Sequence, residues 1–219
     1  MKKTKIYYIR LTDQEVNKYK KDIFESSKNL PLKRFQLYLS LEDQQAQIES
    51  LISYLLLIKA LEDNNFLTTN LGFSYHRSGK PYFTNSNVKF NISHSEDIIA
   101  IAIDNEEIGL DVEKIEEVNA NLISRVYSEQ EKEIYKEKLL DSDFFFKTWT
   151  IKESYIKFSG IGLNADVTQL TFDLNSNQNK YEDKFINTVK INDFYLSLCT
   201  KKKEYQIRKI SLEQLFNKS

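Results

Sequence analysis

Residues 90–113 read FNISHSEDIIAIAIDNEEIGLDVE, and this stretch decides how the chain is built. Its apolar runs, residues 97–104 and 108–112, have the length and β-branched composition of strands joined by a polar link. Side chains two positions apart on a strand share a face, so Asp111 and Glu113 are predicted to project side by side. Two such carboxylates repel each other, and a divalent cation relieves the repulsion because it takes oxygen ligands. The alternative is a solvated acidic face on an edge strand.

The composition bounds the class of protein. The chain has 219 residues, of which 41% are hydrophobic and 13% aromatic, enough for one large domain or two small ones. A net charge of -1 excludes a strongly basic nucleic-acid-binding protein. A single cysteine, Cys199, excludes a disulfide framework or a CxxC metal site within the chain. No run approaches the roughly 20 apolar residues of a membrane span, so we expect a cytoplasmic protein with neither nucleic acid nor membrane among its partners.

The first half of the chain is predicted to surround one buried helix. Residues 43–61 carry a broad apolar stripe at helical spacing, which is typical of a core helix. The other elements expected here are a strand at 5–11, a helix at 14–26 capped by Thr12 or Asp13, a helical segment at 33–38, and strands at 73–75 and 88–91.

The second half shows helices first and strands afterwards. Ser128 and Glu131 form a capping-box pattern at the start of a helix that runs to about residue 140. The other elements expected here are helices at 119–127 and 144–158, the latter capped by Asp141 or Ser142, and strands at 167–174, 185–191, 194–200 and 205–210. We therefore predict an α+β protein of two similar lobes, residues 1–104 and 105–219.

A third carboxylate is predicted on the helix at 144–158. Trp149, Glu153 and Lys157 are spaced by four in the segment WTIKESYIK and share one helix face. The alternative is an ordinary Glu–Lys pair on a solvated helix. Three carboxylates would leave Mg2+ free positions for substrate phosphates. The cations that could neutralise such phosphates are Lys28, Lys33, Arg34, Arg77, Lys80 and His94. Alternatively, each lysine or arginine is a solvated surface charge, and His94 is a hydrogen-bonded structural histidine.

Taken together, these motifs resemble one enzyme family. The segments NISHS at 91–95, IGLDVE at 108–113, WTIKE at 149–153 and FSGIGL at 158–163 resemble those of 4'-phosphopantetheinyl transferases, of the larger monomeric type that activates surfactin-like peptide synthetases. The resemblance implies a pseudo-twofold duplication of α+β lobes with the active site in the cleft between them. It also implies that coenzyme A binds with Mg2+ on its pyrophosphate, and that the serine of an apo carrier protein takes the phosphopantetheine and releases 3',5'-ADP.

The resemblance also implies roles for individual residues. The expected metal ligands are Asp111, Glu113 and Glu153. The expected contacts to coenzyme A are Lys28, Lys33, Arg34, Lys80, Ser93, His94 and Lys157. Among them, Lys28 and Lys33 or Arg34 match a basic N-terminal segment that holds the 3'-phosphate, and His94 matches a phosphate contact. The expected catalytic residues are Glu131, Glu113 and Lys157. Glu131 matches a glutamate assigned as the base for the serine, but the capping box explains it equally well. A water on the metal, or Glu113, is an alternative base.

One position departs from the family pattern. The early helix of these enzymes usually carries an arginine where this chain has Glu49, so a cofactor-binding cation is lost unless another, such as Lys59, replaces it. A weak coenzyme A-binding regulatory protein is therefore an alternative, and a Mg2+-dependent phosphoester hydrolase is another. The apolar residues of segment 115–126, including Leu122, are expected to dock the carrier, of the peptidyl, acyl or polyketide class.

Overall fold

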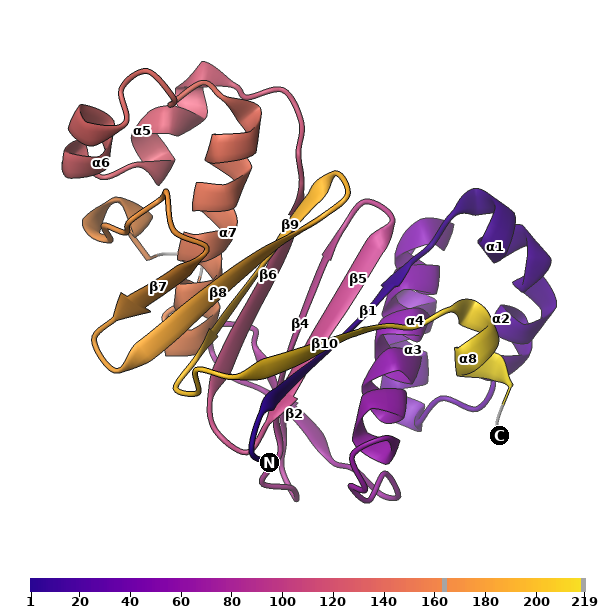
Figure 1. Cartoon of the computed structure of the whole chain (residues 1–219). Coiled ribbons are helices and arrows are strands. Elements are labelled where there is room, and N and C mark those ends of the chain that lie inside the picture. Colours follow the sequence, from indigo (N-terminus) through magenta and orange to yellow (C-terminus); the bar gives the residue numbers. More distant parts are fainter. Residues whose placement is uncertain (163–164, 218–219) are drawn as a thin grey trace.

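The computed structural model describes residues 1–162 and 165–217; Leu163, the last residue of the FSGIGL motif, lies outside them. Two four-stranded sheets pack face to face at the centre of the molecule, and each is covered on its outer side by one long helix (Figure 1). The predicted α+β class is confirmed. The pseudo-twofold duplication stays a prediction.

The first sheet has the strand order β10-β1-β5-β4. β1 (Thr4–Arg10) and β4 (Lys89–Ser95) both run antiparallel to the central strand β5 (Ile98–Asp104). β10 (Tyr205–Lys209) runs parallel to β1, so a strand from the end of the chain completes the sheet of the first half. The division into lobes at residues 104 and 105 stays a prediction. By sequence, β10 belongs to the predicted C-terminal lobe, but it lies in the sheet formed by the strands of the predicted N-terminal lobe.

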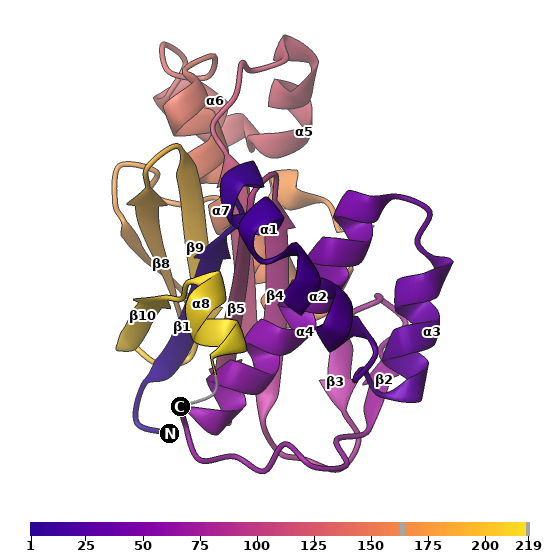
Figure 2. The same cartoon turned by 90° about the vertical axis from the view of Figure 1, so that its right-hand side faces the viewer.

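The long helix α4 (Gln44–Glu62) covers the outer face of the first sheet. Asp43 caps it by accepting a hydrogen bond from the backbone N–H of Ala46. Around α4 lie α1 (Asp13–Lys18), α2 (Lys20–Ser27), α3 (Leu32–Ser40) and α8 (Leu212–Phe216) (Figure 2). The single helix predicted at 14–26 is wrong, because the chain leaves helical geometry at Tyr19 and forms two short helices capped separately.

The second sheet is antiparallel throughout, with the order β6-β9-β8-β7. Its strands are β6 (Ile108–Lys114), β7 (Gln178–Tyr181), β8 (Lys184–Ile191) and β9 (Phe194–Thr200). The helix α7 (Ser142–Ser159), capped by Asp141, covers its outer face.

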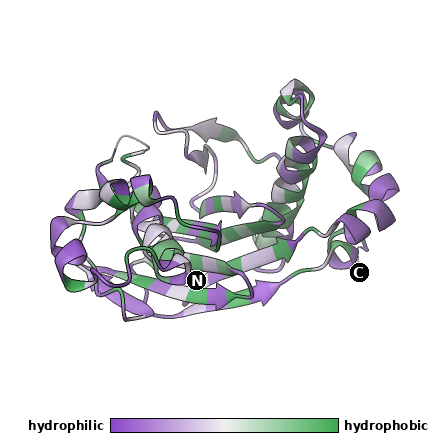
Figure 3. Ribbon diagram, turned by 90° about the horizontal axis from the view of Figure 1, so that it is seen from above, coloured by the Kyte–Doolittle hydropathy of each residue, from purple (hydrophilic) through white to green (hydrophobic). Residues whose placement is uncertain are grey.

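The sheets meet through small and branched apolar side chains. In β5 every residue is buried, and alternate residues serve the two faces of the strand. Ile99 and Ile101 pack toward α4, whereas Ala100 and Ala102 pack toward β6 and β9 of the second sheet. The short alanine side chains let the two sheets approach closely. Colouring by hydropathy shows apolar residues concentrated on these central strands (Figure 3).

Segment 167–174 is not the strand that its composition predicts. It begins with a 3-10 turn, η2 (Val167–Gln169), and its later backbone groups bond to side chains instead of a neighbouring strand. Phe172 N–H donates to Glu131 and Leu174 N–H donates to the Tyr135 hydroxyl. Glu131 also completes the predicted capping box at the start of α6 (Glu129–Ile134). Before α6 the chain forms η1 (Ala120–Leu122) and α5 (Ile123–Val126).

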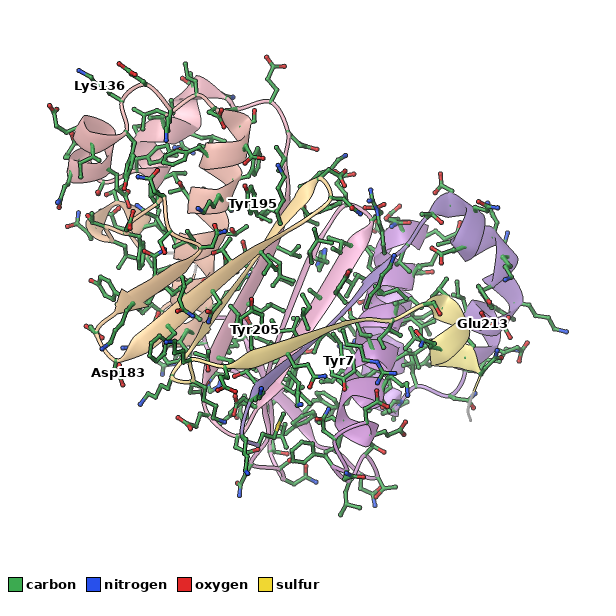
Figure 4. The ribbon with its side chains drawn as sticks, viewed as in Figure 1. Tyr7, Lys136, Asp183, Tyr195, Tyr205 and Glu213 are labelled. Atoms are coloured by element: carbon green, nitrogen blue, oxygen red, sulfur yellow. The ribbon has the colours of Figure 1, made fainter. Side chains whose placement is uncertain are left out.

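The remaining regular structure is a small hairpin, β2 (Phe73–Tyr75) with β3 (Pro81–Phe83). Among the described residues, no helix combines the length and the apolar character that crossing a membrane requires. Figure 4 shows how far the layers extend: Lys136, beyond α6, and Glu213, on α8, lie at opposite ends of the molecule.

Candidate active site

The NISHS segment lies on β4 and joins the two sheets through side chains. Three alternate residues of β4 accept hydrogen bonds from three alternate backbone N–H groups of β6. The bonds run from Leu110 N to Asn91 Oδ1, from Val112 N to Ser93 Oγ and from Lys114 N to Ser95 Oγ, at 2.6, 3.2 and 3.1 Å. We call this set the β4–β6 ladder. It fixes the register of β6 against the first sheet.

The same serine hydroxyls hold the two carboxylates of β6. Ser93 Oγ donates to Asp111 Oδ1 at 3.0 Å, and Ser95 Oγ donates to Glu113 Oε2 at 3.1 Å. Each serine therefore accepts from the backbone of β6 and donates to a side chain of β6. This arrangement fixes both the position and the orientation of the paired acids.

Helix α7 brings the other predicted groups to the same place. Lys157 Nζ lies 2.6 Å from Asp111 Oδ1 and 3.0 Å from Ser93 Oγ. Glu153, one turn earlier, is near enough for the charge of Asp111 to raise its pKa. We call Asp111, Glu113, Glu153 and Lys157 the acidic cluster. The structure brings Lys157 into contact with Asp111, and the metal site expected of the three carboxylates stays a prediction.

Gly109 makes this approach of α7 to β6 possible. A Cβ atom built on Gly109 would lie 1.9 Å from the carbonyl oxygen of Ser154 and 2.3 Å from the backbone nitrogen of Phe158, both on α7. No side chain fits there unless the helix moves. Glycine at this position therefore sets the distance between α7 and the acidic residues two and four positions further along β6.

The carboxylates of the acidic cluster are hard to ionise together. Burial, followed by the charge of Asp111, raises the pKa of Glu113 to about 7, although Ser95, Lys157 and Trp149 act in the opposite direction. The same two causes, burial and Asp111, raise the pKa of Glu153. Lys157 alone therefore does not neutralise the cluster, and an additional cation would stabilise its charged form.

One oxygen of the acidic cluster is left without a partner. Asp111 is 2% exposed, and its Oδ2 atom is buried without a hydrogen-bond partner among the described residues. Within the same residues, no three histidine, cysteine, aspartate or glutamate side chains already lie close enough to form a metal site. The chemistry of the cluster therefore favours a bound cation. In the structure, the ammonium group of Lys157 is the positive charge that contacts Asp111.

His94 lies on β4 but faces away from the ladder. Residues 91, 93 and 95 point toward β6, so His94 points to the opposite face, where Nδ1 lies 3.6 Å from Glu49 Oε2 of α4. Lys59, suggested as a replacement cation, is paired with Asp63 at 2.6 Å. The arginine missing from α4 is therefore not replaced by Lys59 in this structure.

The other predicted coenzyme A contacts are dispersed. Lys80 is held by two carbonyl oxygens, those of Ile108 and Lys157, each at 2.8 Å, and it lines a cavity of about 420 Å³ between the β2–β3 hairpin and the end of α7. Lys28, the residue directly after α2, pairs with Glu25 of that helix. Lys33 is exposed, and Arg34 donates to the carbonyl of Ser50 on α4.

Glu131 lies in a buried network outside the acidic cluster. It is fully buried, and its Oε2 lies 2.5 Å from Lys152 Nζ. Lys152 donates further to the carbonyl oxygens of Val126 and Val167. Since Glu131 also accepts from two backbone N–H groups, those of Ser128 and Phe172, both of its oxygens are bonded. The capping-box interpretation is confirmed, and the contacts of Glu131 give the base role no support.

Several residues that shape the site were not assigned a role from the sequence. They are Asn91 and Ser95 of the ladder, Gly109 beneath α7, and Trp149, which lowers the pKa of Glu113. Small polar residues alternating at 91, 93 and 95 on a strand were the available signal. A cavity of about 890 Å³ lies elsewhere, between α1, α2 and the start of α4.

Comparison with known proteins points in the same direction as these motifs. A family described as the 4'-phosphopantetheinyl transferase superfamily matches residues 107–208. The chain is 32% identical over 155 residues to 4'-phosphopantetheinyl transferase gsp of Aneurinibacillus migulanus, covering 69% of this chain and 65% of that protein. It is 27% identical over 160 residues to 4'-phosphopantetheinyl transferase Sfp of Bacillus subtilis (strain 168), covering 67% and 71%.

A more distant similarity involves a human protein. The L-aminoadipate-semialdehyde dehydrogenase-phosphopantetheinyl transferase of Homo sapiens is 32% identical over 108 residues, covering 44% of this chain and 34% of that protein. The aligned part of this chain thus spans just under two thirds of the Aneurinibacillus protein and about a third of the human one.

Proposed function

We propose that this chain is a 4'-phosphopantetheinyl transferase, which moves phosphopantetheine from coenzyme A to a serine of an apo carrier protein. Its match to that superfamily over residues 107–208, and its similarity to two named transferases over 155 and 160 residues, support the proposal. The serine oxygen bonds to the phosphorus next to the pantetheine, the bond from that phosphorus to the bridging oxygen breaks, and 3',5'-ADP leaves with that oxygen. The observation that carries the proposal is the acidic cluster, in which Ser93 and Ser95 of β4 hold Asp111 and Glu113 of β6.

The acidic cluster fits a divalent cation such as Mg2+. Two observations support this: the buried Oδ2 of Asp111 has no hydrogen-bond partner among the described residues, and burial, followed by the charge of Asp111, raises the pKa values of Glu113 and Glu153, so that an added cation would stabilise their charged forms. We propose that these three carboxylates hold the ion. When bound, it would polarise phosphoryl oxygens of the donor and stabilise the charge that builds on them during transfer.

Lys157 is the residue best placed to act on the phosphates. In the structure its ammonium group bonds to Asp111 and Ser93, and its side chain is 30% exposed. We propose that this partly exposed ammonium group contacts the phosphate that is transferred, while Asp111 would serve to hold the cation. A cation at that position lowers the energy of the transition state because the charge on the phosphoryl oxygens grows as the bond breaks.

We assign the proton of the serine to Glu113 in preference to Glu131. The carboxylate of Glu113 lies in the acidic cluster, where the serine must approach, whereas both oxygens of Glu131 are bonded within the protein. Glu131 is then a positioning residue. With Lys152 it ties the 167–174 segment and the end of α5 to α7, the helix that carries Glu153 and Lys157.

The test is mass spectrometry of an apo carrier incubated with the protein, coenzyme A and Mg2+. We expect the carrier to gain the mass of phosphopantetheine, and a carrier whose serine is replaced by alanine to gain nothing. Peptidyl, acyl and polyketide carriers should be compared, since the proposal covers all three classes. Binding of coenzyme A without modification of any carrier would favour the regulatory alternative, and nucleotide release without a carrier would favour the hydrolase.

A further inference from the structure

Glu49 holds a fixed position beside His94. Its Oε1 accepts a hydrogen bond from Gln45 Nε2 at 3.0 Å, and its Oε2 lies 3.6 Å from His94 Nδ1. The side chain of Glu49 is only 19% exposed, while that of His94 is 56% exposed. The carboxylate is therefore oriented by a neighbour on its own helix and directed at the histidine, whose ring is open to an approaching ligand.

The next residue of α4 meets a second expected phosphate contact. The carbonyl oxygen of Ser50 accepts a hydrogen bond from Arg34 at 3.0 Å, and the guanidinium group lies over the ring of Tyr54. Glu49 and Ser50 are adjacent, so a single turn of α4 contacts both Arg34 and His94. A negative charge thus lies beside one side chain expected to hold a phosphate of coenzyme A, His94, and one residue along α4 from the carbonyl group that binds another, Arg34.

This placement works against a dianionic phosphate. Like charges at a few ångströms repel, and the repulsion is screened less when one charge is largely shielded from water, as Glu49 is. Glu49 also occupies the Nδ1 side of His94 and so balances any positive charge on the imidazole. A donor that places a phosphate here gains less than it would from His94 and Arg34 alone.

We infer that Glu49 relaxes the selection for the 3'-phosphate of the donor, so that dephospho-coenzyme A is used about as well as coenzyme A. This inference rests on the proposed function and concerns the same site. With the dephospho donor, the serine oxygen bonds to the phosphorus next to the pantetheine, the same bond to the bridging oxygen breaks, and AMP leaves with that oxygen. The serine proton passes to the base as before.

The test compares the binding of the two donors by isothermal titration calorimetry, which needs no turnover. For the unchanged protein we expect dissociation constants within about threefold of each other. In Glu49→Gln the charge is removed and the shape kept, and the preference for coenzyme A should rise about tenfold, which equals about 1.4 kcal/mol. Glu62→Gln, the same substitution at the end of the same helix, is the matched control and should leave the ratio unchanged.

Two results would overturn the inference. One is a preference of more than about threefold for coenzyme A in the unchanged protein. The other is an unchanged ratio in Glu49→Gln. Carrier modification by mass spectrometry separates this outcome from failure of the proposed function: loss of the inference alone still leaves transfer from coenzyme A, whereas failure of the proposed function abolishes transfer from both donors.

Discussion

Replacing Ser93 with alanine tests the β4–β6 ladder at its central bond. Ser93 is 5% exposed. Its hydroxyl group accepts hydrogen bonds from Val112 N–H and from the ammonium group of Lys157, and it donates one to Asp111. Its loss strands a buried backbone N–H, at a cost of about 1–3 kcal/mol, and removes a hydrogen bond to a charged group worth about 1.5–3 kcal/mol. Because such contributions are not additive, we expect a loss of about 3 kcal/mol in the free energy of unfolding.

Urea unfolding followed by circular dichroism measures this loss, and the melting temperature should fall by about 6–12 °C. Ser95→Ala removes the corresponding bonds at a half-buried position and should cost less. Ser40→Ala, at the exposed end of α3, is the control and should stay within about 0.5 kcal/mol of the unchanged protein. A Ser93→Ala protein as stable as the Ser40→Ala protein would refute the assignment of the ladder as the joint between the sheets.

Three further substitutions test other parts of the account. Gly109→Ala should displace α7 and lower the stability by about 1–3 kcal/mol through overpacking, together with the transfer rate; a normal rate would contradict the close packing. Lys152→Met leaves the buried charge of Glu131 unpaired and should cost about 3–5 kcal/mol in urea unfolding, which Lys152→Met with Glu131→Gln should partly restore. Leu122→Asp should weaken carrier modification while calorimetry shows unchanged coenzyme A binding; equal loss of both would count against a docking role for this half-buried residue.

Elements with a strong local pattern were predictable from the sequence. The apolar stripe of α4, the fully apolar β5 and the capping box of α6 each reflect interactions within a short segment, and the structure confirms them. Segment 167–174 has the composition of a strand, but its backbone bonds are taken by Glu131 and Tyr135, more than thirty residues away. Composition carries no information about such distant partners, and the same reason hides the pairing of β10 with β1.

In the candidate site, too, local geometry was predictable from the sequence and long-range packing was not. Spacing by two placed Asp111 and Glu113 on one strand face, and spacing by four placed Glu153 and Lys157 on one helix face, because these are geometric properties of strand and helix. That Lys157 bonds to Asp111, and that Glu49 faces His94, depends on how separate elements pack. Gly109 shows why such packing could not be predicted from the sequence: its role depends on the backbone of α7 at residues more than forty positions later.

The most direct measurement is the rate of carrier modification by Asp111→Ala, followed by mass spectrometry with coenzyme A over a range of Mg2+ concentrations. The exposed Glu116→Ala, in the segment after β6, is the control for a lost carboxylate, and circular dichroism checks that both variants are folded. We expect no transfer by Asp111→Ala at any Mg2+ concentration, because the acidic cluster loses its most buried member. Turnover close to that of Glu116→Ala would contradict the claim that this cluster holds the ion on which transfer depends.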